Sequence, residues 1–215
     1  VGNPSDRFME DGLRPIRAIR FASKLNFSIE KYTYSEIFEK EIHKKIQSVS
    51  VERFRDEFMK IMSSPMPSVG LKLLEQTGLM ALLLPEVMDC RGCIQKDDRG
   101  YHQFDVMDHN IYACDGAPIE KPFIRLAAFL HDVGKPAAKI QRTIDGLVIN
   151  NFYNHEFYSS EITKKLMTRM KFSNAEISYV LGGNDIALHL NSRLCLKKVD
   201  RVVHDMLLNA YFTLV

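Results

Sequence analysis

The chain has 215 residues, of which 46% are hydrophobic and 26% charged, and its formal net charge is +2. This length and composition suit a packed core in one or two domains, and no apolar run reaches the roughly 18 residues that a membrane span needs. We therefore expect a cytoplasmic protein with no membrane association, in which any affinity for nucleic acid comes from local basic patches.

The first element holds an acidic pair followed by regularly spaced arginines, in the run Glu10-Asp11-Gly12-Leu13-Arg14-Pro15-Ile16-Arg17-Ala18-Ile19-Arg20. On a helix, residues three and four apart share a face, which predicts that Asp11 and Arg14 project side by side. An acceptor beside a planar donor fork can read the edge of a nucleobase. Arg17 and Arg20 would extend that side as a stripe suited to phosphate. The alternative is a helix start with solvated charges.

Apolar residues at helical spacing predict further helices through the first 80 residues. One follows residues 16–27, and a second is expected to start at a Thr33 cap and to run to residue 46. Two more cover residues 51–62 and 69–78, separated by a break at 63–67 that contains two prolines. Exposed basic residues on these helices are candidate phosphate contacts or simply solvated charges: Lys44, Lys45, Arg53 and Arg55.

The helical pattern is interrupted between about residues 88 and 100, which predicts a boundary between a region at 1–90 and a region at 91–215. Cys90 and Cys93 form a C-x-x-C in this stretch, but no second pair lies nearby to complete a zinc ribbon. We therefore expect the four cysteines to be free thiols.

The second region carries histidines and carboxylates at separated positions. His131 and Asp132 directly follow an apolar helix predicted at 124–130, and His109 precedes His131 by 22 residues. His155 lies 24 residues after His131, and Asp185 follows 30 residues later. Imidazoles and carboxylates from separate helices of a bundle can converge on one cation. The alternative for a single His–Asp pair is a hydrogen bond inside a core.

The N-terminal run resembles the tRNA nucleotidyltransferase family, which includes the CCA-adding enzymes and their poly(A) polymerase relatives. The match is to the family segment R-F-x-E-D-x-L-R-x-x-R-A-x-R-F-A, which begins here at Arg7. In that family the segment opens the neck domain, and its E-D-x-x-R core selects CTP or ATP. By position, the resemblance implies that Glu10, Asp11 and Arg14 select the nucleotide, with Asp11 and Arg14 reading the base. From the arginine spacing we expect Arg17 to bind the nucleotide as well.

The same resemblance implies tRNA and nucleoside triphosphates as partners, with ATP and CTP as substrates of the parent enzyme. Nucleotidyl transfer in this family depends on a preceding head domain whose paired carboxylates hold metal ions. The chain begins at Val1, where that head would end, so we expect 1–215 to be a part of a longer enzyme. We expect it to select nucleotides and bind tRNA, to lack transferase activity alone, and to be cut short at its C-terminus too.

The ordered set H…HD…D resembles the HD superfamily of metal-dependent phosphohydrolases, and residues 121–136 and 151–156 resemble the HD domain appended to this transferase family. By position, the resemblance implies that a divalent metal (Mg, Mn, Fe, Ni or Zn) is bound by four residues, with two auxiliary groups beside it. The ligands are His109, His131, Asp132 and Asp185, and the auxiliary groups are His155 and Lys135. The implied fold is all-α, with a helical neck and body at 1–90 and an HD-type helical bundle at 91–215.

Three functions remain open from the sequence. The first is the nucleotide-selecting and tRNA-binding part of a CCA-adding enzyme. The second is a metal-dependent HD-type phosphohydrolase acting on RNA ends or nucleotides, and the third is a non-catalytic RNA-binding module. The E-D-x-x-R motif favours the first, because a plain hydrolase has no use for a base-reading pair.

Overall fold

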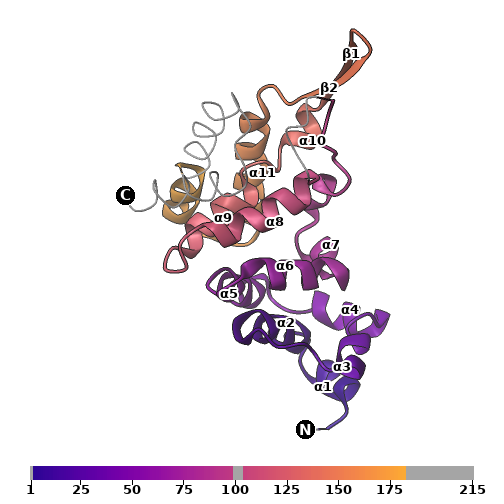
Figure 1. Cartoon of the computed structure of the whole chain (residues 1–215). Helices are drawn as coiled ribbons and strands as arrows, with labels where there is room; N and C mark the ends of the chain where they lie inside the picture. Colours follow the sequence, from indigo (N-terminus) through magenta and orange to yellow (C-terminus); the bar gives the residue numbers. More distant parts are fainter. Residues whose placement is uncertain (1, 99–103, 183–215) are drawn as a thin grey trace.

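The computed structural model of the chain describes residues 2–98 and 104–182, which are mostly helical (Figure 1). The expected all-α fold is thereby confirmed. The first half contains α1 (Pro4–Glu10), α2 (Arg14–Leu25), α3 (Lys31–Glu36), α4 (Lys40–Gln47), α5 (Val51–Met62), α6 (Pro67–Gln76), α7 (Leu79–Leu83) and the 3-10 helix η1 (Pro85–Cys90). The second half contains α8 (Val106–Gly116), α9 (Pro122–Leu130), α10 (Lys135–Ala138), strands β1 (Ile140–Ile144) and β2 (Leu147–Asn151), and α11 (His155–Arg169). A last helical segment covers 174–182.

Apolar spacing located α5 as predicted, but the helix expected from Thr33 to residue 46 is two helices. The Glu30 side chain caps α3 by accepting hydrogen bonds from the backbone N–H groups of Tyr32 and Thr33. The chain then turns, and α4 begins at Lys40. A glutamate can satisfy the free N–H groups of a helix start although it is not among the commonest caps. The predicted role of Thr33 as the cap is therefore wrong.

The apolar stripe predicted along 16–27 is only partly buried. Ile16 and Ile19 face the core, whereas Phe21 and Leu25 are about half exposed and Phe27 is 68% exposed. The C-terminal half of α2 therefore presents aromatic and aliphatic side chains to solvent.

The hydrophobic core runs without a break through both halves of the chain. Helix α6 packs against α8, and α5 packs against α9, where the rings of Phe58 and Phe129 lie 6.3 Å apart. The buried guanidinium of Arg125 on α9 donates hydrogen bonds to the carbonyl oxygens of Ala117, Met62 and Ser64. Arg125 thus connects the C-terminal end of α5 to the C-terminal end of α8 through hydrogen bonds.

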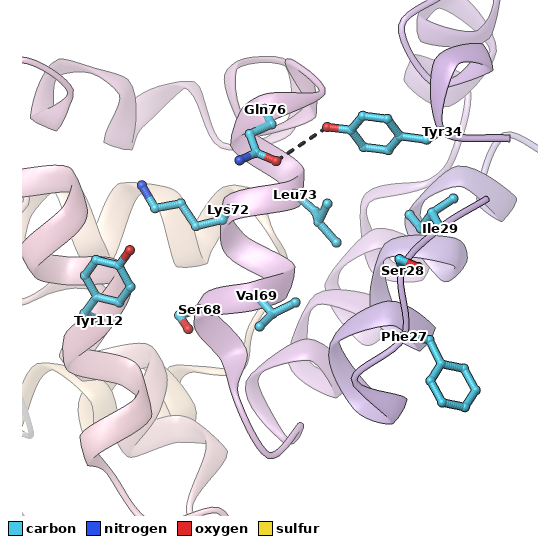
Figure 2. Close-up of a pocket in the computed structure, with 10 residues that line it drawn as sticks. All are labelled: Phe27, Ser28, Ile29, Tyr34, Ser68, Val69, Lys72, Leu73, Gln76 and Tyr112. Atoms are coloured by element: carbon cyan, nitrogen blue, oxygen red, sulfur yellow. Dashed lines mark hydrogen bonds between the residues drawn. The ribbon is translucent and has the colours of Figure 1, made fainter. Parts of the chain in front are cut away.

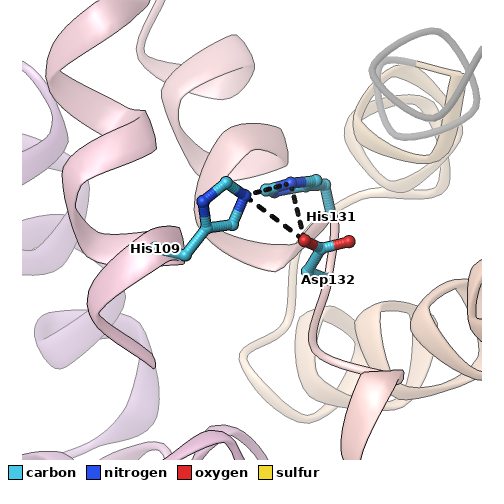
Figure 3. Close-up of side chains that lie close together, drawn as sticks. All are labelled: His109, His131 and Asp132. Atoms are coloured by element: carbon cyan, nitrogen blue, oxygen red, sulfur yellow. Dashed lines mark hydrogen bonds and ion pairs between the residues drawn. The ribbon is translucent and has the colours of Figure 1, made fainter. Parts of the chain in front are cut away.

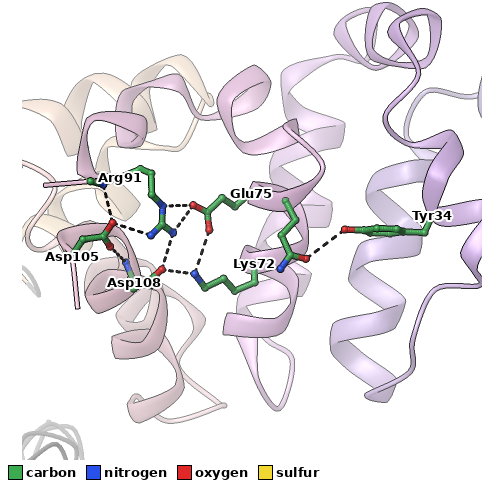
Figure 4. Close-up of polar contacts among 8 residues, drawn as sticks. Tyr34, Lys72, Glu75, Arg91, Asp105 and Asp108 are labelled. Atoms are coloured by element: carbon green, nitrogen blue, oxygen red, sulfur yellow. Dashed lines mark hydrogen bonds and ion pairs between the residues drawn. The ribbon is translucent and has the colours of Figure 1, made fainter. Parts of the chain in front are cut away.

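A network of ion pairs reinforces this junction on the surface (Figure 4). Residues 91–98, which follow η1, are called the connector here. Its Arg91 guanidinium contacts the carboxylates of Glu75 on α6, Asp105 and Asp108. Lys72 on α6 also pairs with Asp108. Helix α6, the connector and the start of α8 are therefore held together by charge as well as by apolar packing.

The two strands form an antiparallel hairpin that projects from the helical body (Figure 1). Its turn is Asp145-Gly146, and both residues have positive φ angles, of 52° and 79°. An Asp-Gly pair between apolar residues is a strong hairpin signal, because a type I′ turn needs positive φ at both positions. This hairpin was not predicted from the sequence, and residues 152–154 join it to α11.

Among the described residues, no helix is long and apolar enough to cross a membrane. Cys90, Cys93 and Cys114 are free and buried, which confirms the prediction of free thiols for these three. Cys195 lies outside the described residues. Burial raises the pKa of the Cys90 thiol, so that it stays protonated at neutral pH.

Candidate functional site

The E-D-x-x-R motif lies at the junction of two helices, so the prediction that Asp11 and Arg14 share a face of one helix is wrong. Helix α1 ends at Glu10, and α2 begins at Arg14. Pro15 has no N–H group, and its ring would clash with the carbonyl of residue 11 inside a continuous helix. The chain must therefore turn before Arg14 and start a new helix there.

Each charged residue of the motif has a partner in this turn. The Arg14 guanidinium pairs with Glu10 at 2.6 Å. The Asp11 carboxylate accepts hydrogen bonds from the Leu13 N–H at 3.0 Å and from Arg53 on α5 at 2.9 Å. These hydrogen bonds, first that from Leu13, hold the pKa of Asp11 below its usual range. The turn also fits closely on α4, because a Cβ on Gly12 would lie 2.4 Å from the Lys45 carbonyl oxygen.

The arginine stripe on α2 surrounds one buried carboxylate. Glu57 on α5 is only 3% exposed, and its oxygens lie 3.6 Å from Arg17, 3.1 Å from Arg20 and 3.0 Å from Lys60. Three cations share a single anion, so this face keeps an excess of positive charge. Such a face suits the phosphates of RNA or of a nucleotide.

The second candidate site is built where α8, α9 and α11 meet. His109 comes from α8, His131 and Asp132 follow the C-terminus of α9, and His155 begins α11. A Cβ on Gly134 would lie 2.3 Å from the backbone nitrogen of Ser159 and 2.4 Å from the carbonyl oxygen of His155. Only glycine therefore allows residues 131–134, the His-Asp turn, to lie directly on α11.

Three donor atoms converge in this site (Figure 3). His109 Nε2 lies 3.2 Å from His131 Nε2 and 3.3 Å from Asp132 Oδ2, and His131 Nε2 lies 3.2 Å from the same oxygen. Around a divalent ion with bonds of about 2.1 Å, neighbouring donor atoms are about 3.0–3.4 Å apart. The spacing therefore fits one shared cation.

The protonation states also fit a cation. His131 Nδ1 lies 2.8 Å from the Ala128 carbonyl oxygen, which fixes the hydrogen on Nδ1 and leaves a lone pair on Nε2. Burial lowers the pKa of His109 to about 3, so its imidazole is neutral. Burial alone would raise the pKa of Asp132, but its basic surroundings, in which the Lys135 ammonium carries the positive charge, outweigh burial and hold that pKa well below its usual range.

The auxiliary groups also contact Asp132, which is fully buried and receives no hydrogen bond of regular geometry. His155 Nε2 lies 3.2 Å from Oδ1, and Lys135 Nζ lies 2.6 Å from Oδ2. The fourth predicted ligand, Asp185, lies outside the described residues. Sequence reasoning missed Gln95, whose Oε1 accepts a hydrogen bond from Lys135 at 2.6 Å.

A separate groove of about 500 Å³ lies between α6 and the segment that joins α2 to α3 (Figure 2). Its lining is mainly apolar and aromatic, with Tyr34 and Tyr112 at its sides. Among the described residues that line it, Lys72 is the charged one and is already paired with Glu75 and Asp108. The groove shares no residue with either site described above.

Two family models match the chain in succession. Residues 26–90 match the model described as "Probable RNA and SrmB- binding site of polymerase A", and residues 99–202 match the HD domain. The A-adding tRNA nucleotidyltransferase of Deinococcus radiodurans is 31% identical over 179 residues, which cover 80% of this chain and 40% of that protein. The resemblance to the tRNA nucleotidyltransferase family is confirmed.

Two further tRNA nucleotidyltransferases show how the similarity is distributed. The CC-adding enzyme of Thermus thermophilus is 28% identical over 188 residues, covering 82% of this chain and 41% of that protein. A CCA-adding enzyme of a Geobacillus species is 44% identical over 89 residues, covering 41% of this chain and 21% of that enzyme. The chain thus spans at most about two fifths of these relatives.

Proposed function

We propose that the chain is the nucleotide-selecting and tRNA-binding part of a tRNA nucleotidyltransferase, acting together with a head domain that performs the transfer. The observation that carries this proposal is the E-D-x-x-R turn, in which Asp11 and Arg14 lie beside the positively charged face of α2. The names of the relatives support CTP and ATP as the nucleotides. Within this proposal, residues 1–90 form the neck and body and residues 91–215 the HD domain.

Asp11 and Arg14 would read the base while Arg53 and Glu10 hold their side chains in place. Asp11 offers carboxylate oxygens that accept hydrogen bonds, and Arg14 offers a planar set of donors. Glu10 would orient Arg14 through their ion pair. Arg17, whose side chain is 44% exposed, would contact a phosphate from the neighbouring turn of α2.

The test uses a protein in which this segment follows its transferase head. Asp11→Ala and Arg14→Ala are expected to reduce discrimination between CTP and ATP at least about tenfold, since each removes a hydrogen-bonding partner of the base. Asp6→Ala, an exposed carboxylate of α1, is the matched control. Unchanged nucleotide choice in both motif variants would refute the assignment.

Binding of tRNA can be measured on the chain alone. We expect fluorescence anisotropy to show binding of a tRNA that lacks its 3′ CCA, with an affinity that falls steeply as salt rises. Arg17→Gln should weaken binding and lower the salt dependence. An affinity independent of salt would contradict a phosphate-binding face.

We also propose that His109, His131 and Asp132 bind a divalent metal, with Asp185 as the fourth ligand. The three described residues form the one cluster of metal-ligating side chains found among residues 2–98 and 104–182. A bound divalent metal would lower the pKa of its water and polarise a phosphoryl oxygen. The cluster therefore favours a second function, which is hydrolysis of a phosphate ester at RNA ends or in nucleotides.

The chain's own residues would support that hydrolysis in distinct ways. Asp132 lies between both histidine ligands and His155 and would fix their orientation. His155 Nδ1 lies 2.7 Å from the Phe152 carbonyl oxygen, and its side chain is 20% exposed. His155 is therefore placed to bind a substrate oxygen or to donate a proton to the leaving group.

Metal content and hydrolysis of a generic phosphodiester test this second function. The wild-type chain is expected to retain metal after purification, and the double variant His131→Ala/Asp132→Ala is expected to lose both metal and activity. Metal without turnover would leave a structural metal centre. Activity that persists in the double variant would show that the hydrolysis comes from elsewhere.

A further inference from the structure

Lys135 is a buried cation inside the candidate metal centre. It is 7% exposed, and its ammonium lies 2.6 Å from Asp132 Oδ2 and donates a hydrogen bond to Gln95 Oε1 at 2.6 Å. The ring of Phe152 lies 5.5 Å away and offers a cation–π contact. These partners come from the connector after η1, the His-Asp turn and the segment between β2 and α11. The ammonium is thus held from three sides.

The ammonium occupies the same oxygen that the metal would need. Asp132 Oδ2 is the atom that both His109 Nε2 and His131 Nε2 approach, at 3.3 and 3.2 Å. A buried carboxylate is costly unless a cation compensates its charge, and Lys135 already supplies one. A divalent ion entering beside this ammonium would be repelled by it and would have to share or displace it.

We propose that Lys135 is a built-in counter-ion that competes with divalent metal for Asp132, and that Gln95 positions it there. The inference rests on the metal centre proposed above and concerns its regulation. Without metal, Lys135 compensates the Asp132 charge and keeps the site folded. When metal binds, Lys135 withdraws from Oδ2, and the connector residue Gln95 determines how readily it does so.

Gln95 connects the position of Lys135 to the packing of the connector on α6. It is 2% exposed and lies on the connector, residues 91–98. The same connector carries Arg91, whose ion pairs fasten it to α6. A movement of the connector would therefore change the position of the Lys135 ammonium and, with it, the affinity of the site for metal.

The test is calorimetric titration of the intact chain with Mn²⁺ and, separately, with Ni²⁺. Lys135→Met is expected to raise the affinity for metal at least about tenfold, because it removes a like charge close to the ion. Gln95→Leu keeps the charge but loosens its hold, and a smaller increase is expected. Lys164→Met, which removes an exposed lysine of α11, is the control and should change affinity less than about twofold.

Unfolding measurements provide the second readout. Lys135→Met should unfold at a lower temperature than the wild type without metal, and saturating Mn²⁺ should restore it by a larger increment than it gives the wild type. If Lys135→Met does not fold, the metal affinity of Gln95→Leu tests the inference, and a value higher than that of the wild type supports it. Binding by the variants with none by the wild type would also support the inference.

Two results would overturn it and are distinguishable. If the wild type binds metal, His131→Ala abolishes binding, and both Lys135→Met and Gln95→Leu bind no more tightly than the wild type, the metal centre stands and the competition is refuted. If neither the wild type nor any variant binds metal, the metal centre itself is refuted, and the competition with it.

Discussion

The Asp11 carboxylate accepts a hydrogen bond at 2.9 Å from Arg53, which lies 42 residues further along the chain on α5. The residue proposed to read the base is therefore oriented by a helix outside its own motif. Arg53 and Asp11 are 49% and 25% exposed, so the ion pair contributes little to folding. We expect loss of the Arg53–Asp11 ion pair to change the choice of nucleotide.

Arg53→Gln is accordingly expected to lower the free energy of unfolding by less than about 1 kcal/mol. In a protein that carries the transferase head, it should reduce discrimination between CTP and ATP several-fold, because one Asp11 oxygen loses its fixed partner. The ratio of the two incorporation rates measures this. Lys44→Gln, which removes a charge paired with Glu41 on the same helix, is the control. An equal ratio in both variants would separate Arg53 from nucleotide selection.

Gly134→Ala tests the close packing of the His-Asp turn on α11. The added Cβ would lie 2.3 Å from a backbone nitrogen and 2.4 Å from a backbone oxygen, and backbone atoms cannot move aside cheaply. We expect a loss of about 1–3 kcal/mol or more in stability and a weaker metal site. Denaturant unfolding and metal titration measure the two effects.

Gly182→Ala is the control for that substitution, since a Cβ at this position would meet no atom of residues 2–98 and 104–182 within 4 Å. It should leave metal affinity unchanged and should keep or slightly raise stability, because alanine favours a helix over glycine. Equal stability of the two alanine variants would show that the turn can move away from α11.

The sequence predicted the elements whose structure depends on local pattern. Apolar spacing located α5, and the order of His109, His131 and Asp132 anticipated three residues that do lie together. Two predictions failed because a single residue overrides the local pattern: Pro15 divides the motif between two helices, and Glu30 caps α3 in place of Thr33. A third failed because apolar spacing does not distinguish a buried stretch from an exposed one: the exposed end of α2 has the same spacing as its buried start.

Other features could not be read from local sequence because they depend on distant partners. Gln95 reaches Lys135 across 40 residues, and Arg53 reaches Asp11 across 42. Nothing in the residues around Gln95 indicates a buried amide beside an ammonium. The hairpin is a different case, because its Asp145-Gly146 turn is a local signal that is visible in the sequence.

Arg125→Met tests the polar tie between the two halves of the core. The substitution keeps most of the side-chain volume but leaves three buried carbonyl oxygens without their donor. Each such group costs about 1–3 kcal/mol, although water can reach some of them after relaxation. We expect a loss of about 3 kcal/mol in chemical denaturation. The exposed Arg142→Met on β1 should lose less than about 0.5 kcal/mol, and a similarly small loss for Arg125→Met would show that the carbonyls find other partners.

The last prediction concerns the dependence of stability on pH at the pair that joins η1 to α11. Both Glu86 oxygens accept hydrogen bonds from Arg169, at 2.6 and 2.8 Å. Partial burial would raise the pKa of Glu86, but Arg169 outweighs it and the pKa lies below the ordinary value of 4.5.

A carboxyl group whose pKa is lower in the folded state stabilises the protein above its unfolded pKa. That contribution is lost as the pH falls below about 4.5 and through the folded pKa. Glu86→Gln should therefore be less stable than the wild type at pH 7, and the difference should shrink as the pH falls through this window. Urea unfolding at several pH values measures it. A difference that stays constant down to pH values of about 2 would mean that the ionised form of Glu86 adds nothing to stability.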